Sequence, residues 1–252
     1  MNTDLAHKNF GLYLYGIFPD TIPETLEIKG LDGKSVHSQV VDGFTFLYSQ
    51  SCQEKYLASR RNLLAHERVL EQTMHEGFHV LLPLRFGLVV KDWETIMSQL
   101  INPHKEQLHK LFQKLAGQRE VSIKIFWDAK AELQAMMESN HELRQQRDNM
   151  EGKKLTMEEV IQIGQSIESN LQTRKQAVIE VFTRELNPFA QEIVVSDPMT
   201  EEMIYNAAFL IPWDSEPLFS ERVEAIDKKF GTRLRIRYNN FTAPYTFALL
   251  DS

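Results

Sequence analysis

The second half of the chain carries the pattern that most restricts its fold, an ordered alternation of strand-like and helix-like segments. Strand-like runs rich in β-branched and aromatic residues occupy residues 121–127, 189–195, 204–211 and 234–238. Helical periodicity fills residues 129–186, after the first run, and residues 215–230, before the last run. The resulting order is strand, helical hairpin, strand, strand, helix, strand. This order is typical of a ferredoxin-like βαββαβ sandwich, here with an enlarged first crossover.

The enlarged crossover has its own start and stop signals. Asp128 is expected to cap a first helix that runs to about Met150, and the Gly152-Lys153-Lys154 segment is expected to end it. Thr156 and Glu159 match the capping box that begins a second helix. The apolar residues of this second helix recur at helical intervals and predict its inward face: Val160, Ile163, Ile167, Leu171, Val178, Phe182 and Leu186.

The first half of the chain has a different pattern, typical of an α+β domain. A strand is predicted over residues 10–17, and Asp42-Gly43 between two β-prone runs predicts a hairpin within residues 36–48. Ser51 and Glu54 match a capping box, so a helix is expected to begin at Ser51 and to end at Gly77. The predicted buried face of this helix consists of Leu57, Leu63, Leu64, Leu70 and Met74.

A short buried strand over residues 78–82 and a helix over residues 93–115 complete this half. Asp92 is the predicted cap of that helix, and Pro103 is expected to bend or split it because proline has no amide hydrogen. Gly117 is the predicted boundary between the two halves of the chain, just before the next strand. We therefore predict a two-domain α+β protein, with an N-terminal α+β domain over residues 1–117 and a C-terminal ferredoxin-like domain over residues 118–252.

Composition and charge narrow the class of protein. Because 28 Lys and Arg oppose 35 Asp and Glu, the net charge is −7, which argues against a dedicated binder of nucleic acid backbones. No run approaches the roughly 18 apolar residues of a membrane helix, and the early apolar run lacks a signal-peptide cleavage site. The single cysteine, Cys52, fits a reducing compartment. We expect a soluble intracellular protein.

One motif matches a catalytic signature. His75-Glu76-Gly77-Phe78-His79 has the H-E-x-x-H spacing of zinc hydrolases, which need both histidines on one face of a continuous helix. Gly77 is expected to end the helix, and residues four apart on a strand lie about 13 Å apart, too far to share a zinc ion. A zinc hydrolase using His75, Glu76 and His79 is therefore a minor alternative, and we favour a helix end followed by a strand.

A second alternative rests on Arg233, Arg235 and Arg237, which form a basic face on the last predicted strand. Ferredoxin-like RNA-recognition modules combine such a face with a basic-Gly-aromatic signature on a central strand. Residues 204–210 lack that signature. An RNA-binding module is therefore the alternative, and an exposed strand face paired with acidic neighbours is the favoured interpretation.

None of the remaining candidate residues and motifs indicates an enzyme, a cofactor site or a metal site. His66-Glu67 lies among arginines on the helix predicted from Ser51, and we interpret it as a solvated charged face rather than a general base. Cys52, in the predicted first turn, is interpreted as structural, because no histidine partner is identifiable. The chain contains no P-loop, no G-x-G-x-x-G and no G-x-S-x-G motif.

Five blocks, in order along nearly the whole chain, resemble the gas vesicle accessory proteins of the F/L family. They are Tyr13-Leu14-Tyr15-Gly16-Ile17, Ala65-His66-Glu67-Arg68-Val69-Leu70-Glu71, Val80-Leu81-Leu82-Pro83-Leu84-Arg85-Phe86-Gly87, Asn206-Ala207-Ala208-Phe209-Leu210 and Ala243-Pro244-Tyr245-Thr246-Phe247. The third is the most specific, because it is similar to the family's VLPLRFG block. The last departs from the family by lacking a tryptophan.

The resemblance implies a non-enzymatic part in building gas vesicles. The implied partners are the hydrophobic major shell protein and other accessory proteins, with no nucleic acid, lipid membrane, small-molecule substrate or cofactor. The implied location is the gas vesicle, on the gas-facing side of its shell.

The candidate protein-binding residues are Leu84, Arg85, Phe86 and Gly87, which follow a strand and a proline. Two interpretations stay open. Either these residues form an exposed binding loop, or Leu84 and Phe86 close the core while Arg85 pairs with a carboxylate. The polar side of the helix over residues 160–186 is a second candidate docking surface.

Overall fold

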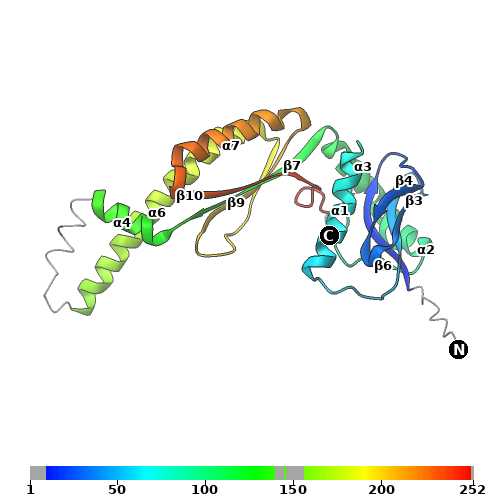
Figure 1. The fold of residues 1–252 in the computed structure, drawn as a ribbon, viewed down its shortest axis with the longest axis horizontal. Helices are drawn as coiled ribbons and strands as arrows, with labels where there is room; N and C mark the ends of the chain where they lie inside the picture. The colour runs from blue at the N-terminus through cyan, green and yellow to red at the C-terminus, as the bar shows by residue number, and fades with distance from the viewer. Residues whose placement is uncertain (1–9, 140–144, 146–155, 251–252) are drawn as a thin grey trace. The chain divides into compact units, whose positions relative to one another are not determined.

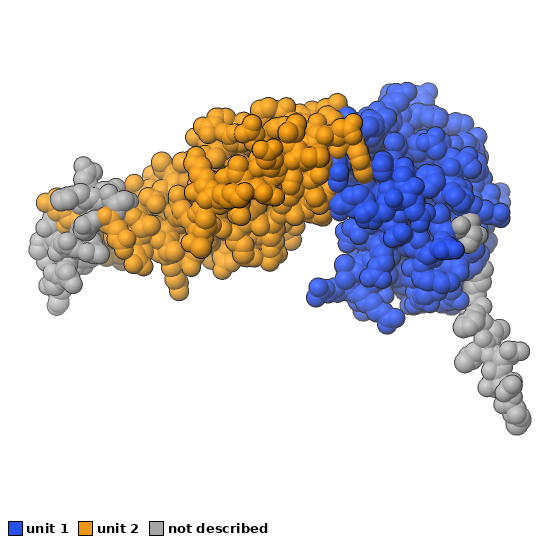
Figure 2. Space-filling model, turned by 45° about the horizontal axis from the view of Figure 1, so that its top comes forward, with its two compact units in different colours: residues 1–120, 241–252 blue, residues 121–240 orange. Residues whose placement is uncertain are grey.

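A computed structural model describes residues 10–139, 145 and 156–250 of the chain (Figure 1). The chain forms two compact units, one of residues 1–120 and 241–252, the other of residues 121–240 (Figure 2). Each unit contains a β-sheet and helices, so the predicted α+β class is confirmed. No described helix has both the length and the apolar character needed to cross a membrane.

The sheet of the first unit is built around β1 (Gly11–Phe18), of which every residue is buried. β1 pairs antiparallel with β4 (Phe44–Ser51), β5 (Leu82–Pro83) and β6 (Val89–Val90). Beyond β4 lie β3 (Ser35–Val41) and then β2 (Thr25–Lys29). The central position of β1 explains why its sequence is apolar and aromatic on both faces.

The predicted hairpin at Asp42-Gly43 is confirmed. Val41 pairs with Phe44 across the turn, and Asp42 (φ 50°) and Gly43 (φ 86°) both adopt the left-handed conformation. A two-residue hairpin turn with positive φ at both positions matches the right-handed twist of its strands.

The first long helix, α1 (Arg60–His75), begins later than predicted. Ser51 is the last residue of β4, where it pairs with Gly11, so strand pairing takes the place of the expected helix start. Ser59 caps α1 instead, because its side chain accepts a hydrogen bond from the amide of Asn62. The expected end is confirmed, since Gly77 follows the helix with φ 100°.

The buried face of α1 also differs from the prediction. Leu70 and Met74 are buried as expected, but Leu57, Leu63 and Leu64 are exposed. Leu57 precedes the helix, and the side of α1 that packs on the sheet is rotated away from Leu63 and Leu64. That side consists of His66, Val69, Leu70, Thr73 and Met74.

The strand predicted over residues 78–82 is reduced to Leu82 and Pro83 in β5. The amide of Phe78 donates to the carbonyl of Thr73, and the amide of His79 donates to the carbonyl of Gly77. These bonds close the end of α1, so the amides are not available to a sheet.

The helix predicted over residues 93–115 is split, as expected from Pro103. α2 (Trp93–Ile96) leads into a π-helical turn (Met97–Ile101) and then into α3 (Asn102–Leu115). Pro103 lies in the first turn of α3, directly after the π-helical turn, and has no amide hydrogen to donate to a carbonyl of that turn. Asp92 caps α2 as predicted, by accepting a hydrogen bond from the amide of Thr95 at 2.9 Å.

The second unit has the predicted element order. In sequence it contains β7 (Gln118–Trp127), α4 (Ala129–Ser139), α6 (Met157–Leu186), β8 (Glu192–Val195), β9 (Met203–Pro212), α7 (Glu216–Phe230) and β10 (Leu234–Thr242). The sheet order is β10-β7-β9-β8, so the first and third strands are central, as expected for a βαββαβ sandwich. The Thr156–Glu159 capping box is confirmed. The expected helix end near Met150 and the break at 152–154 lie outside the described residues.

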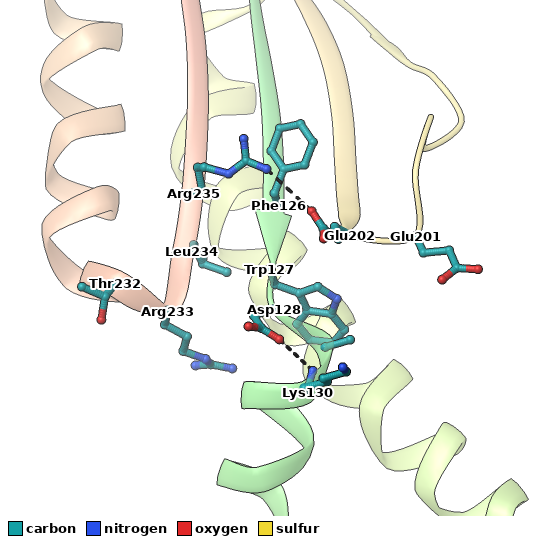
Figure 3. A pocket seen from close by; sticks show the side chains of 11 residues that line it. Phe126, Trp127, Asp128, Lys130, Glu201, Glu202, Thr232, Arg233, Leu234 and Arg235 are labelled. Atoms are coloured by element: carbon teal, nitrogen blue, oxygen red, sulfur yellow. Dashed lines mark hydrogen bonds and ion pairs between the residues drawn. The ribbon is translucent and has the colours of Figure 1, made fainter.

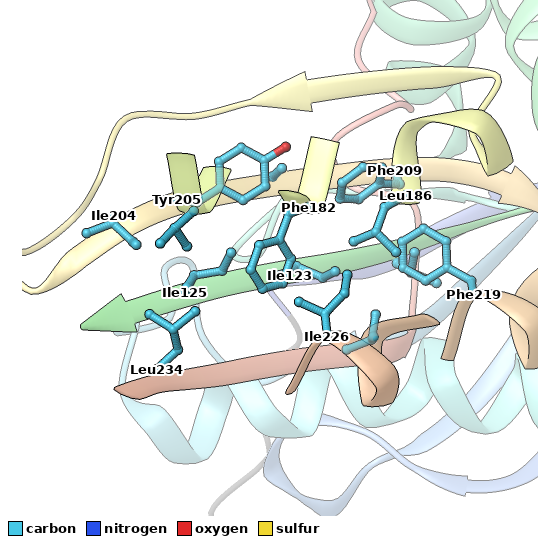
Figure 4. Close-up of a cluster of buried hydrophobic side chains, with 14 of the residues drawn as sticks. Ile123, Ile125, Phe182, Leu186, Ile204, Tyr205, Phe209, Phe219, Ile226 and Leu234 are labelled. Carbon is cyan, nitrogen blue, oxygen red and sulfur yellow. The ribbon is translucent and has the colours of Figure 1, made fainter. Parts of the chain in front are cut away.

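The core of the second unit lies between the sheet and the helices α6 and α7 (Figure 4). Ile123 and Ile125 of β7 face Phe182 of α6 and Phe219 of α7, all of them buried. The predicted inward face of α6 is confirmed at Val178, Phe182 and Leu186. It is wrong at Val160, which is 50% exposed, because the first turns of α6 extend past the strands (Figure 1).

The compact units differ from the predicted domains in two segments, because residues 118–120 and residues 241–252 both belong to the first unit. Residues 241–252 were expected in the second domain but belong to the first unit. Ala243 and Phe247 are buried there, and the amide and hydroxyl of Thr246 donate to the Glu120 carboxylate at 2.9 and 2.7 Å. The end of the chain therefore completes the core of the unit that its beginning forms.

Candidate functional site

The candidate protein-binding residues form a tight connection between β5 and β6, here called the 84–87 turn (Leu84, Arg85, Phe86 and Gly87). The amide of Leu84 donates to the carbonyl of Tyr15 at 2.9 Å, and the amide of Leu14 donates to the carbonyl of Leu88 at 3.0 Å. Both ends of the turn are therefore fixed to β1. Gly87 has φ 90°, a conformation that favours glycine.

Two buried side chains hold the turn from inside. The amide of Gly87 donates to Oη of Tyr13 at 3.0 Å, and Oη of Tyr13 lies 2.8 Å from Nδ1 of His66. Nε2 of His66 lies 3.1 Å from the carbonyl oxygen of Leu84. Since a carbonyl only accepts, Nε2 carries the proton, and the Tyr13 hydroxyl donates to Nδ1. The Tyr13 hydroxyl therefore holds the Gly87 end of the turn, and the neutral His66 imidazole holds the Leu84 end.

Burial governs the protonation of this pair. Burial lowers the pKa of His66 to about 4, although the hydrogen bond to Leu84 opposes this shift. Burial also raises the pKa of the Tyr13 hydroxyl, against the hydrogen bond from Gly87. The interpretation of His66 as part of a solvated face is therefore wrong, since its side chain lies beneath the turn.

The turn divides its side chains between inside and outside. The Phe86 ring is half-buried, with its centroid 6.2 Å from that of Tyr13 and 5.9 Å from that of His66. Leu84 is also half-buried, whereas Arg85 is exposed. No described residue forms an ion pair with Arg85. Leu84 and Phe86 therefore help close the core, whereas the expected pairing of Arg85 with a carboxylate is not found among the described residues.

The H-E-x-x-H residues do not share one helix face. His75 is the last residue of α1, and His79 follows the helix end at Gly77. The His75 ring stacks on Phe241, with centroids 4.1 Å apart and planes 14° from parallel. Within residues 10–139, 145 and 156–250, no group of three His, Cys, Asp or Glu side chains is arranged to hold a metal ion. The arrangement favours the helix-end interpretation.

Arg233 forms an ion pair with the buried carboxylate of Glu132. Its guanidinium donates through Nε and Nη2 to Glu132 of α4, with Nη2 at 2.9 Å, and Arg174 of α6 donates to the same carboxylate at 3.3 Å. Burial by itself would raise the pKa of Glu132, but the two arginines outweigh burial and lower it. This triad joins α4, α6 and the turn that precedes β10.

Arg235 and Arg237 lie over the ring of Phe126, at 4.2 and 5.0 Å from its centroid. Arg235 also lies 3.8 Å from Glu202, beside a cavity of about 550 Å³ (Figure 3). Side chains of both signs of charge line the cavity, namely Lys130, Arg233 and Arg235 together with Asp128, Glu201 and Glu202. The expected acidic pairing is found for Arg233, with Glu132, and for Arg235, with Glu202.

Glu120 is a buried carboxylate that the sequence did not single out. Besides Thr246, it bonds the backbone of Phe247. Burial raises the pKa of Glu120, while the hydrogen bonds from Thr246 oppose the rise. Glu120 therefore anchors the C-terminal block that resembles the F/L family. Its partner lies 126 residues further along the chain, so no local pattern could have indicated it.

Cys52 also departs from its predicted place. It lies between β4 and α1 rather than in the first turn of a helix. Its amide donates to Oη of Tyr56 at 3.3 Å. Cys52 thus belongs to the connection that replaces the predicted helix start.

Comparison with known proteins gives one consistent result. The model of the family described as "Gas vesicle synthesis protein GvpL/GvpF" matches residues 11–249. Gas vesicle protein F of Dolichospermum flosaquae is 84% identical over 241 residues, covering 96% of this chain and 98% of that protein. The crystal structure of GvpF from Anabaena sp. PCC7120 aligns with a TM-score of 0.90 at 68% identity, over 97% of this chain and 100% of that one. The GvpF structure from Microcystis aeruginosa aligns with a TM-score of 0.84 at 63% identity, over 96% and 100%.

Proposed function

This chain belongs to the gas vesicle synthesis protein GvpL/GvpF family, and we propose that it assists gas vesicle formation by binding the hydrophobic major shell protein. A gas vesicle role follows from the family. The finer proposal is that the role is that of an assembly factor without catalytic activity. A shell subunit with a water-repelling face aggregates unless another protein covers that face before polymerisation.

We propose the 84–87 turn as a contact point. The observation that carries this proposal is the combination of a rigid backbone and an exposed cation. The turn is fixed by Tyr13, Tyr15 and His66, while Arg85 projects from it without an ion pair among the described residues. A preorganised surface loses little conformational entropy on binding.

The test is co-expression with the major shell protein, followed by affinity capture at moderate salt. Wild-type protein is expected to retain the shell protein in soluble form, and unrelated small hydrophobic proteins are expected not to be captured. Arg85→Glu should reduce the captured amount about tenfold or more, a loss typical of a central interface residue. Lys110→Glu is the matched control, because Lys110 is an exposed cation on α3 of the same unit.

The outcomes separate the two parts of the proposal. Failure of the wild type to capture the shell protein, with both proteins folded, contradicts shell binding. Capture by Arg85→Glu at the wild-type level contradicts the role of the turn and leaves shell binding standing. Other gas vesicle accessory proteins, tested by the same capture, are the next proposed partners.

We also propose residence on the gas-facing side of the shell. An epitope tag on the chain should then resist protease in intact isolated vesicles and be cleaved once the vesicles are collapsed by pressure. Cleavage in intact vesicles would contradict this location.

A further inference from the structure

The cavity of about 550 Å³ lies entirely within the second unit, where the end of β7, the start of α4, the turn before β9 and the start of β10 meet (Figure 3). Its volume falls in the range of about 300–1,000 Å³ that is typical of small-molecule sites. The amide of Trp127 donates to the carbonyl of Glu202 at 3.0 Å, and the ion pair of Arg233 with Glu132 joins the turn before β10 to α4. The fold therefore holds the walls of the cavity in place before any ligand binds.

The charged side chains that line the cavity comprise three cations and three anions: Lys130, Arg233, Arg235, Asp128, Glu201 and Glu202. Two of them already have partners in the fold. Arg233 pairs with Glu132, and Oδ1 of Asp128 accepts the amides of Lys130 and Ala131 at the start of α4. The charges that remain for a ligand are those of Lys130, Arg235, Glu201 and Glu202. They balance, with two of each sign.

These four side chains have capacity for further partners. Neither Lys130 nor Glu201 forms an ion pair within the described chain. Arg235 lies 3.8 Å from Glu202, which is longer than a hydrogen bond, and the two side chains are 53% and 70% exposed. The guanidinium of Arg235 also lies 4.2 Å from the centroid of the Phe126 ring, so it is already positioned for a ligand.

Two neutral side chains that line the cavity carry hydrogen-bond donors without a partner. Trp127 is 8% exposed, and its indole N–H donates to no residue that the structure describes. The hydroxyl of Thr232 likewise has no hydrogen bond to a described residue. In the view of Figure 3, Arg235 lies above the Trp127 ring and Lys130 lies below it. A buried indole N–H without a partner is costly, and a peptide carbonyl from a ligand would satisfy it.

We infer that this cavity binds a short peptide that has a free ammonium end and a free carboxylate end. Arg235 binds the carboxylate, Glu201 binds the ammonium, and the indole of Trp127 donates to a peptide carbonyl. A simple anion would leave two carboxylates of the cavity without a partner, and a simple cation would leave two cations without one. A zwitterion offers a partner to both signs of charge. This inference uses the cavity alone and does not rest on the proposed function.

The test is isothermal titration calorimetry of the full chain with the tripeptide glycyl-leucyl-glycine in four forms. The tripeptide is used with both ends free, acetylated at its amino end, amidated at its carboxyl end, and blocked at both ends. The free form is expected to bind about tenfold or more tightly than either singly blocked form, because each block removes one charge-assisted hydrogen bond. The doubly blocked form is expected to bind weakest.

Two variants assign each end of the peptide to its residue. Arg235→Met should weaken binding of the free peptide about tenfold, and amidation of the peptide should then cost no further affinity. Glu201→Gln should weaken binding by a similar factor, and acetylation of the peptide should then cost no further affinity. This non-additivity is the signature of a direct contact between the residue and the peptide end that is blocked.

Each variant has a matched control in the same unit. Arg237→Met is the control for Arg235→Met, because Arg237 lies 5.0 Å from the centroid of the same Phe126 ring but does not line the cavity. Glu221→Gln on α7 replaces an exposed carboxylate outside the cavity and is the control for Glu201→Gln. Both controls are expected to bind the peptide like the wild type. Thermal melting establishes that each variant is folded.

Three results would overturn the inference. Absence of binding of the free tripeptide at millimolar concentration excludes a peptide site. Equal affinity for the free and the singly blocked forms shows that the cavity does not recognise both charged ends. Wild-type affinity in either folded variant, Arg235→Met or Glu201→Gln, shows that the peptide binds elsewhere.

Discussion

The hydroxyl oxygen of Tyr13 lies 2.8 Å from Nδ1 of His66, and this bond joins the central strand of the first unit to its longest helix. The same hydroxyl accepts the Gly87 amide, and the same imidazole bonds the Leu84 carbonyl. The shape of the 84–87 turn, from which Arg85 projects into solvent, is therefore set by two buried side chains.

Removing the Tyr13 hydroxyl is expected to destabilise the first unit. Tyr13→Phe keeps the ring but leaves the Gly87 amide and Nδ1 of His66 without their partner, at a cost of about 1–3 kcal/mol in the free energy of unfolding. Urea denaturation measures this loss. Tyr48→Phe is the control, since no described residue bonds the Tyr48 hydroxyl, and its stability should match the wild type. Equal stability of both variants would contradict the role of the pair.

The stability of the fold should depend on pH through His66. Its pKa in the folded protein is about 4, below the ordinary value of 6.5, so between these values the unfolded chain binds a proton that the folded chain does not. The stabilisation is complete above pH 6.5 and is lost as the pH falls to 4, by about 3 kcal/mol. Denaturation of wild type and His66→Gln from pH 4 to 7 measures it, because Gln does not titrate. A stability difference between them that stays constant with pH would argue against a neutral buried His66.

Thr246 is expected to stabilise the fold because it donates hydrogen bonds to the buried carboxylate of Glu120. Thr246→Val removes the hydroxyl that donates to Glu120 at 2.7 Å and leaves a buried charge with one fewer partner. We expect a loss of about 1–3 kcal/mol in the free energy of unfolding, measured in urea. Thr246→Ser keeps the hydroxyl and should remain within about 1 kcal/mol of the wild type. If Thr246→Ser were less stable than Thr246→Val, the methyl group and not the hydrogen bond would hold the C-terminal segment.

Local signals in the sequence predicted the local structure well. The Asp42-Gly43 turn, the Thr156 capping box and the end of α1 at Gly77 each depend on a few neighbouring residues. The predicted start of α1 was wrong because the true start depends on a residue that is distant in sequence. Ser51 fits a helix cap locally, but its pairing with Gly11, far away in sequence, keeps it in β4. Tertiary pairing overrides local preference at such positions.

The buried polar partners could not be predicted for the same reason. His66 meets Tyr13 across 53 residues, Glu132 meets Arg233 across 101, and Glu120 meets Thr246 across 126. A single sequence shows that histidines and carboxylates are present but not which ones the fold buries. Tyr13, His66 and the 84–87 turn lie in three of the blocks that resemble the family, but the sequence did not indicate that these three blocks meet in the fold.

Arg233, just before β10, and Arg235, within β10, should differ sharply in their contribution to stability. Arg233→Met leaves the buried Glu132 with Arg174 alone, whereas Arg235→Met breaks an exposed pair 3.8 Å apart and a contact with the Phe126 ring. We expect a loss of about 3 kcal/mol in the free energy of unfolding for the first variant and of about 1 kcal/mol or less for the second. Adding Glu132→Gln to Arg233→Met should recover part of the loss, because it removes the uncompensated charge. Denaturation of the three variants measures these differences. Equal losses for the two arginines would mean that Glu132 retains solvent access, and the triad would then not bind α4 and α6 to the sheet.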